Sequence, residues 1–452
     1  MTAVSTTSDR ASQVVRQAMN DPVFRDAWRH LERRLDRYVD EIIRVTEIPA
    51  PPFGEEDRAR YVAGRLREIG LDAVRIDDAG NVVGHWPAGP GNPRRGNGTA
   101  GGGGPASGTA PGLSPVPAPA RRPPGAVSPT GPAESQAGPV VISAHLDTVF
   151  PAGTPIRVRR RGNRLYAPGI GDNASSVACL LMLAEALAAT PFAPHLPVIW
   201  LFNTGEEGLG NLRGMRHFLD TLPRAPAAVL VVDGGLGMIS YRGIGSRRLR
   251  AVFTGPGGHS WKDFGRPSAI HGAGRAVARL SGLPVPSRPR TTWNVGRIQG
   301  GTTVNTIAAR CELEIDLRSE DGSTLRELEQ AVRRELRAAA REEGVEVAVE
   351  VIGHRPEGSL PPDHDLVCLV RAAMAACGVP VHELAASTDA NLPLSRGIAA
   401  VTFGIRHGDG AHTLNEYIDR TDLDRGLRLA LLALLACVRW AERALTRPGG
   451  GN

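Results

Sequence analysis

The chain has 452 residues, a formal net charge of +6 and 41 % hydrophobic residues. This length exceeds what one ordinary hydrophobic core accommodates, so two or three domains are expected. The arginines form only small clusters, at 157–161 and 247–250, and they do not gather with aromatic residues in one stripe, so nucleic-acid binding is not favoured.

The composition also bears on the compartment. The first twenty residues lack the continuous apolar stretch of a secretory signal. The longest apolar run, 429–438, is too short to cross a bilayer and is typical of a core helix. Five cysteines without a C-x-x-C pair are expected to be free buried thiols. We therefore expect a cytoplasmic protein that does not act at a membrane.

The N-terminal part predicts helices that lead into a first pair of strands. Residues 21–70 show helical periodicity with many charges, and 65–73 combine a helix end, a glycine stop and a strand start. Residues 82–83 belong to a short predicted strand. The segment 87–139 is dense in Gly, Pro, Ser and Ala, so it is predicted to be a disordered insertion.

Strands and helices alternate after this segment. The β-rich run VVISAHLDTV is followed by a helix, a strand, a helix and a strand, predicted at 173–189, 198–202, 210–221 and 227–235. Strands that are apolar throughout and alternate with helices are typical of a mostly parallel sheet with helices on both faces. The fold class is therefore predicted to be α/β.

A different pattern occupies residues 246–354. The predicted order is strand, helix, two strands, a long charged helix and a last strand, which is the ferredoxin-like βαββαβ arrangement. The chain then returns to helix and strand at 365–405 and ends in a long helix. We expect a small domain, 246–354, inserted into a larger one formed by 1–245 and 355–452.

Side chains that bind metals occur where the predicted strands end. In an open parallel sheet, the ligand site lies beyond the carboxyl ends of the strands. A lone histidine or a glutamate pair is ordinarily structural or solvated, but several such groups at one sheet edge indicate a metal site. The candidates are His145 and Asp147, Glu206 and Glu207, Asp233, His412, and Asp172 at a glycine-rich helix start.

Spacing and ligand type refine this prediction. His145 and Asp147 are two apart on a strand and share a face, so the carboxylate could orient the imidazole. Two histidines and three carboxylates suit a pair of divalent ions about 3.5–4 Å apart that share one bridging carboxylate. Zinc is favoured, and manganese or cobalt would accept the same ligands.

These motifs occur in an order that resembles the co-catalytic zinc exopeptidase family, which includes peptidase T, carboxypeptidase G and succinyl-diaminopimelate desuccinylase. The motifs are SAHLDTV, GIGDNAS, FNTGEEGLGN, VVDGG, GPGGHS, VNTIAA and AHTLNE. The resemblance implies an exopeptidase-like catalytic domain with an inserted lid and dimerisation domain. It implies that the metal ligands are His145, Asp172 as the bridge, Glu207, Asp233 and His412.

The resemblance also implies roles for residues beside the metals. Glu206 would be the general base for a water bound between the ions, and Asp147 would support His145. In a homodimer, His259 would reach the partner's active site and stabilise an oxyanion. Asn305 and Arg318 would contact a substrate carboxylate. The peptide bond Asp172–Asn173 is expected to be cis.

The residue at the fourth metal-ligand position, here Asp233, bears on which reaction is expected. In the resembling family, Asp at this position accompanies aminopeptidases, whereas Glu accompanies carboxypeptidases and deacylases. Asp233 therefore favours an aminopeptidase for short peptides, and an N-acyl-amino-acid amidohydrolase or carboxypeptidase is the alternative. A catalytically silent binding protein is opposed by the presence of Glu206 and all five ligands. A nucleotide loop at APGIGD is discounted because no GxGxxG motif follows a strand there.

Overall fold

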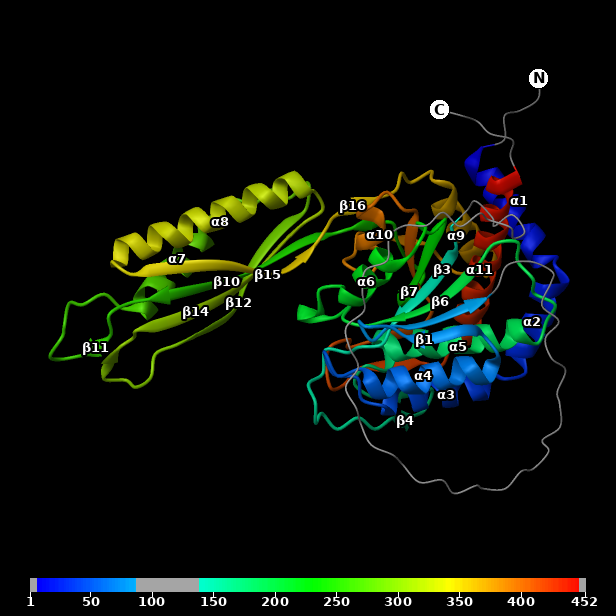
Figure 1. The fold of residues 1–452 in the computed structure, drawn as a ribbon, viewed down its shortest axis with the longest axis horizontal. Helices are drawn as coiled ribbons and strands as arrows, with labels where there is room; N and C mark the ends of the chain where they lie inside the picture. Colours follow the sequence, from blue (N-terminus) through cyan, green and yellow to red (C-terminus); the bar gives the residue numbers. More distant parts are fainter. Residues whose placement is uncertain (1–5, 87–137, 447–452) are drawn as a thin grey trace, which may run out of the picture.

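The computed structural model describes residues 6–86 and 138–446, and these residues form two units that lie side by side (Figure 1). The predicted disordered insertion at 87–139 falls outside the described residues, apart from its last two positions. The larger unit contains both ends of the described chain, and the smaller unit extends from it as a long, thin domain (Figure 1).

The larger unit is built on an eight-stranded sheet. Its four central strands, β6, β3, β7 and β18, run parallel, and antiparallel neighbours flank them. This arrangement confirms the predicted α/β fold with a mostly parallel sheet. In spatial order the strands are β1 (Asp72–Ile76), β2 (Val82–Trp86), β6 (Val198–Asn203), β3 (Val140–His145), β7 (Ala228–Leu236), β18 (Ala400–Gly404), β8 (Met238–Ser240) and β17 (His382–Glu383).

Both faces of this sheet are buried. Successive residues of β6 alternate between two cores, with Trp200 and Phe202 in one and Ile199 and Leu201 in the other. This alternation explains why the strand is apolar throughout. Helices on the first face are α1 (Thr7–Met19), α2 (Pro22–Glu32), α3 (Leu35–Glu47), α4 (Glu56–Ile69), α5 (Ser175–Ala188), α9 (Asp365–Ala376) and α11 (Leu423–Thr446); α6 (Arg213–Thr221) and α10 (Asn391–Ser395) cover the second.

One segment of the larger unit has the length and composition of a membrane span. This segment, Ile170–Ala188, includes α5, and 89 % of its apolar window is buried inside the fold. Such burial is typical of the core helix of a globular domain. The cytoplasmic location stays a prediction.

The smaller unit has its own sheet and its own core. The sheet has the order β12-β14-β10-β15, and all its neighbouring strands are antiparallel. Two helices cover one face and enclose a core that includes Leu249, Phe253 and Leu336. The elements are β10 (Gly245–Thr254), α7 (Ala269–Ser281), β12 (Thr291–Gly300), β14 (Arg310–Ser319), α8 (Gly322–Glu343) and β15 (Glu346–Arg355).

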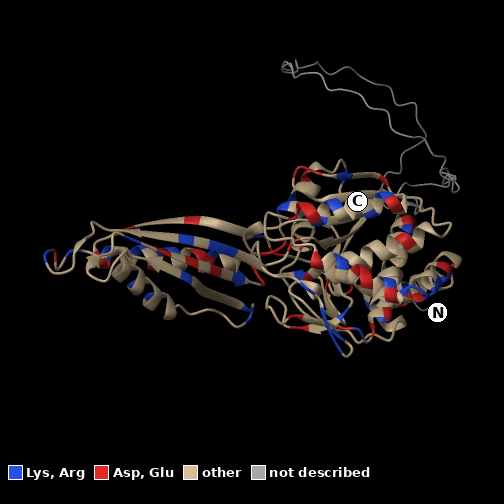
Figure 2. Ribbon diagram, turned by 90° about the horizontal axis from the view of Figure 1, so that it is seen from below, with Lys and Arg blue, Asp and Glu red and all other residues tan. Residues whose placement is uncertain are grey.

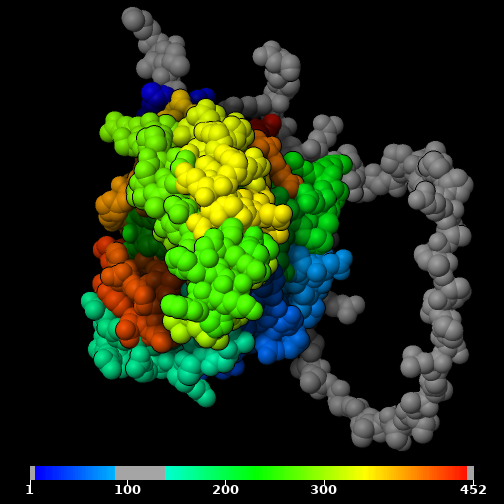
Figure 3. All heavy atoms as spheres, turned by 90° about the vertical axis from the view of Figure 1, so that its left-hand side faces the viewer, coloured from blue at the N-terminus to red at the C-terminus, as the bar shows by residue number. Residues whose placement is uncertain are grey.

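The other face of this small sheet is charged. Arg250 forms ion pairs with Glu312, Glu314 and Glu350 on the neighbouring strands, and Figure 2 shows positive and negative positions distributed along the strands. The far end of the unit carries the short ribbon β11 (Gly258–His259) and β13 (Thr306–Ile307). Seen end-on, this unit stands in front of the larger one (Figure 3).

A second ribbon lies where the chain passes between the units. It pairs β9 (Arg242–Gly243) with β16 (Gly358–Ser359), so the entering and leaving segments are joined by backbone hydrogen bonds. The assignment of 246–354 as an independent domain stays a prediction.

Two features were not predicted from the sequence. Helix α1 begins with a capping box in which Thr6 and Asp9 bond reciprocally. A further four-stranded sheet is formed by β19 (His407–Asp409), β20 (Tyr417–Asp419), β5 (Arg164–Tyr166) and β4 (Arg159–Arg161). Its strands have three residues each, which is too short for a periodic signal.

Candidate active site

The predicted metal ligands converge at the carboxyl edge of the parallel strands. Ligand atoms of His145, Asp172 and Asp233 lie within 4.8 Å of one another, and so do those of Asp172, Glu207 and His412. A further group of the same size joins His145 to Glu206 and Glu207. The residues therefore offer two groups of donors that meet at one carboxylate.

That shared carboxylate is Asp172, and its two oxygens face opposite sides. Oδ1 lies 3.0 Å from Nε2 of His145, and Oδ2 lies 3.1 Å from Nε2 of His412. Nε2 of His412 is also 3.0 Å from Oε1 of Glu207. A carboxylate with one oxygen in each donor group has the arrangement that a bridge between two cations requires. The peptide bond Asp172–Asn173 is cis, as expected.

The loop that carries Asp172 is held by a buried glutamate. The carboxylate of Glu416 accepts hydrogen bonds from the backbone N–H groups of Gly169, Gly171 and Asp172, at 2.6, 2.8 and 2.8 Å. Nε of Arg406 donates to the carbonyl of Gly171 at 2.9 Å. A Cβ added to Gly171 would lie 2.7 Å from the guanidinium carbon of Arg406, so a larger residue would displace this side chain from the loop.

Replacing Glu416 by alanine is therefore expected to lower metal affinity by about 10- to 100-fold, as loss of groups that orient metal ligands does. The reason is that three backbone donors beside Asp172 lose their acceptor. Competition with a chromogenic chelator measures the affinity, and Glu327→Ala on the exposed face of α8 serves as the control. Unchanged affinity in Glu416→Ala would show that the loop keeps its shape without this carboxylate.

Asp147 organises the turn that bears the two glutamates. Its carboxylate accepts the backbone N–H of Glu206 at 3.0 Å and that of Glu207 at 2.7 Å. Nδ1 of His145 lies 3.0 Å from the backbone carbonyl of Asp147 and 3.6 Å from its carboxylate. Asp147 therefore fixes the imidazole chiefly through its backbone carbonyl and fixes the glutamates through its side chain.

Burial and mutual hydrogen bonding perturb the titration of the two histidines and of Asp172. Burial lowers the pKa of His145, but hydrogen bonds with Asp147 and Asp172 outweigh burial and raise the pKa well above its usual range. Hydrogen bonds with Asp172 and Glu207 raise the pKa of His412 to about 10. Burial acts to raise the pKa of Asp172, yet hydrogen bonds from both histidines lower it.

Other carboxyl groups of the cluster are held toward the protonated form. Burial, reinforced by the charge of Asp172, raises the pKa of Asp233 to about 6. Burial raises the pKa of Asp389 to about 7 and that of Glu206 well above its ordinary value, while Arg355 acts in the opposite direction on both. Such crowded buried carboxylates are stabilised in the ionised form by cations. The donor types and their charge therefore suit divalent metal ions.

Three predicted site residues, His259, Asn305 and Arg318, belong to the smaller unit. His259 and Asn305 occupy the far end, where His259 Nδ1 accepts the backbone N–H groups of Trp261 and Lys262 and the Asn305 carbonyl accepts the N–H of Ser260. Arg318, on β14, forms an ion pair with Asp316 at 2.7 Å. Within one chain, the three are not brought together with the predicted metal ligands. Their roles stay predictions.

Several polar residues that complete the site were not predicted from the sequence. Arg355 pairs with Glu206, and Asp389 accepts a hydrogen bond from the amide of Asn203 at 2.7 Å. Glu416 lies within the motif AHTLNE, which was a usable signal. Most of the metal ligands were predicted from their positions at the carboxyl ends of parallel strands. Arg355 and Asp389 do not follow such a strand end, so they could not be predicted in this way.

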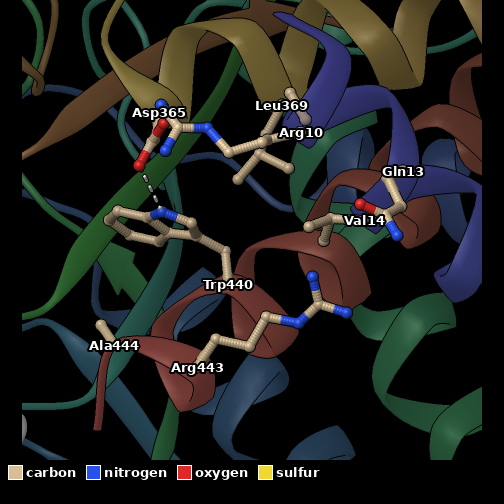
Figure 4. A pocket seen from close by; sticks show the side chains of 9 residues that line it. Arg10, Gln13, Val14, Asp365, Leu369, Trp440, Arg443 and Ala444 are labelled. Atoms are coloured by element: carbon tan, nitrogen blue, oxygen red, sulfur yellow. Dashed lines mark hydrogen bonds between the residues drawn. The ribbon is translucent and has the colours of Figure 1, made fainter. Parts of the chain in front are cut away.

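A separate cavity lies at the opposite side of the larger unit, between α1, α9 and α11. Its lining includes Arg10, Val14, Leu369 and Trp440, and Trp440 Nε1 donates to Asp365 at 3.2 Å (Figure 4). This lining holds one carboxylate and no histidine. It lacks the donor set that distinguishes the metal-ligand cluster.

Comparison with known proteins identifies the family to which the chain belongs. The model of the peptidase family M20/M25/M40 matches residues 141–436. Acetylornithine deacetylase of Klebsiella pneumoniae (strain 342) is 28 % identical over 258 residues, which are 53 % of this chain and 66 % of that relative. The chain thus spans just under two thirds of the length of this curated relative.

Solved structures share the fold. The aminopeptidase PepT from Bacillus cereus superposes with a TM-score of 0.64 at 18 % identity, over 89 % of this chain and 98 % of that one. A dinuclear metal-binding peptidase of the M20 family from Bacillus subtilis gives 0.59 at 16 % identity, over 91 % and 99 %. At these identities the likeness establishes the fold alone.

Proposed function

The chain belongs to the peptidase family M20/M25/M40 and is a hydrolase, and on that premise we propose that it is an aminopeptidase for short peptides. The proposed cofactor is a pair of divalent metal ions, with zinc first and manganese or cobalt as alternatives. The observation that carries the proposed two-metal hydrolase is the carboxylate of Asp172, whose two oxygens lie in two separate donor groups.

The residues divide between the two ions as the donor groups suggest. His145, Asp172 and Asp233 would hold one ion, and Asp172, Glu207 and His412 would hold the other. When bound, the ions would polarise the scissile carbonyl and acidify a water molecule between them. The carboxylates of Asp147 and Glu416 would keep the ligand-bearing turns in place.

Glu206 is the proposed general base. Its carboxylate lies within 4.8 Å of ligand atoms of His145 and Glu207, so it is next to both donor groups that share Asp172 but belongs to neither. It would accept a proton from the attacking water and then deliver that proton to the leaving nitrogen.

The preference for an aminopeptidase rests on Asp233 as the fourth ligand. The matched deacetylase from Klebsiella supports the second candidate, an amidohydrolase that removes an acyl group from an amino acid. Both reactions hydrolyse an amide bond with the same water and base. They differ in whether the substrate presents a free amino group or a blocked one.

The experiment compares a tripeptide that has a free N-terminus with the same tripeptide after N-acetylation. The protein is loaded with zinc or with manganese, and Glu206→Gln is the control. Cleavage of the free peptide alone is expected, and this activity disappears in the control. Cleavage of the acetylated peptide alone would replace the aminopeptidase with a deacylase or carboxypeptidase. Cleavage of neither would contradict a peptidase.

We also propose that the protein is a homodimer in which His259 completes the partner's site. The imidazole is exposed at the far end of the smaller unit, and Nδ1 is engaged by backbone donors, so Nε2 is left to face a ligand. A fixed donor of this kind would stabilise the oxyanion of the tetrahedral intermediate.

Mixing two inactive variants tests this arrangement. His259→Ala should lower kcat by about 10²-fold or more, as loss of an oxyanion donor does. After subunit exchange, His259→Ala and Glu206→Gln chains should regain activity, because one site of each mixed dimer has both residues. Failure to regain activity, or a fully active monomer in sedimentation analysis, would contradict the proposal.

A further inference from the structure

Arg355 is the last residue of β15, where the chain leaves the smaller unit. Its backbone is paired in register with Ser246 at the start of β10. Arg355 is only 5 % exposed, and its guanidinium reaches Glu206, which is 6 % exposed. A buried cation thus extends from the smaller unit to the proposed base of the larger one.

The contacts of this guanidinium fix it firmly. Nη1 lies 3.1 Å from Oε1 of Glu206 and also donates to the carbonyl of Ser387 at 3.2 Å. Nη2 donates to the backbone carbonyl of Glu206. The planar fork therefore holds the side chain and the main chain of one glutamate together, which the point charge of lysine could not do in the same way.

Glu206 is consequently restrained at three atoms. Its N–H donates to Asp147 Oδ1 at 3.0 Å, and its carbonyl and Oε1 accept from Arg355. Oε2 accepts no hydrogen bond from the part of the chain that the structure describes. One carboxylate oxygen is therefore anchored, and the other is left for proton transfer.

We propose that Arg355 is the positioning residue of Glu206, which aims Oε2 at the attacking water without touching the substrate. This inference rests on the proposed function, in which Glu206 is the base. Since proton transfer requires hydrogen-bond geometry between base and water, a carboxylate free to rotate would be in the reactive orientation only part of the time. The neighbouring Asp389 accepts a hydrogen bond from Asn203, and Arg355 acts on it through its charge.

The contact between Arg355 and Glu206 links the two units of the protein. The residue belongs to a strand of the smaller unit, and Glu206 belongs to the larger one, so a rotation between the units would act directly on the base. A catalytically competent orientation of Glu206 thus depends on how β15 sits against the larger unit.

The test uses Arg355→Ala and Arg355→Lys in the full-length, metal-loaded enzyme. Both variants should keep their bound metal and the KM of the parent. Arg355→Ala should lose about 10²-fold in kcat, since a misplacement of about 1 Å in a reacting group can cost that much. Millimolar guanidinium should restore part of the kcat of Arg355→Ala. Arg65→Ala, which removes ion pairs with Glu41 and Glu185 among the helices, is the control and should keep its kcat.

If Arg355 only stabilised the fold, its variants would behave differently in these measurements. Loss of metal or a raised KM, with no response to guanidinium, would overturn the inference. If Arg355→Ala does not fold, Arg355→Lys decides the question, because a parental kcat in that variant would equally overturn it. Activity retained in Glu206→Gln would instead refute the base assignment itself, so the two failures are distinguishable.

Discussion

Replacing Glu206 by glutamine is expected to lower kcat by about 10²- to 10⁴-fold, the range that general bases contribute. The amide keeps the size of the side chain but cannot accept the proton of the attacking water. The metal content should not change, because Glu206 is not among the proposed ligands. Steady-state kinetics and elemental analysis of the same preparation measure both quantities.

The neighbouring residue supplies the matched control. Glu207→Gln changes the same atoms one position along the chain, and Glu207 shares a donor group with Asp172 and His412. This variant should lose bound metal as well as activity. If the two variants behaved alike, the assignment of one glutamate to proton transfer and the other to metal binding would be wrong.

Asp172→Asn is expected to have the largest effect. The amide nitrogen cannot ligate a cation, so one of the two donor groups loses its shared oxygen. Since metal ions supply several kcal/mol of transition-state stabilisation, activity should fall by about 10³-fold or more.

Metal stoichiometry distinguishes this effect from misfolding. The variant should bind fewer than two ions per chain at metal concentrations that saturate the parent. Asp26→Asn, in an exposed ion pair on α2, is the control and should behave as the parent does. Two tightly bound ions together with full activity in Asp172→Asn would exclude Asp172 as the bridge.

Much of the fold could be predicted because its strands and helices alternate clearly. The strand Val198–Asn203 is apolar at nearly every position. Such a strand is typical of a sheet that has a hydrophobic core on both faces. The strands β4, β5, β19 and β20 gave no such signal because each has three residues. Helix α1 was missed although the Thr6 and Asp9 capping box was readable in the sequence.

The candidate site was predictable where chemistry follows strand ends. His145 ends the apolar strand β3, and Glu206 and Glu207 follow the apolar strand β6 after two residues, so the topology of a parallel sheet brings them together. Arg355 lies 149 residues from Glu206 along the chain and ends a strand of a different sheet. No periodic pattern encodes that contact, which arises only from how the two units pack.

Residues at the far end of the smaller unit pose a different problem. His259 and Asn305 do not meet the predicted ligands within one chain, and the role proposed for His259 requires a second copy. A motif can suggest such a residue by resemblance, but the contact itself would form only in the assembled dimer.

Diffraction from zinc-loaded crystals at the zinc absorption edge tests the central claim most directly. Two anomalous peaks are expected on either side of the Asp172 carboxylate, about 3.5–4 Å apart, as in co-catalytic sites. One peak should contact His145 and Asp233, and the other should contact Glu207 and His412. A single peak, or a pair that does not share Asp172, would contradict the proposed dinuclear centre.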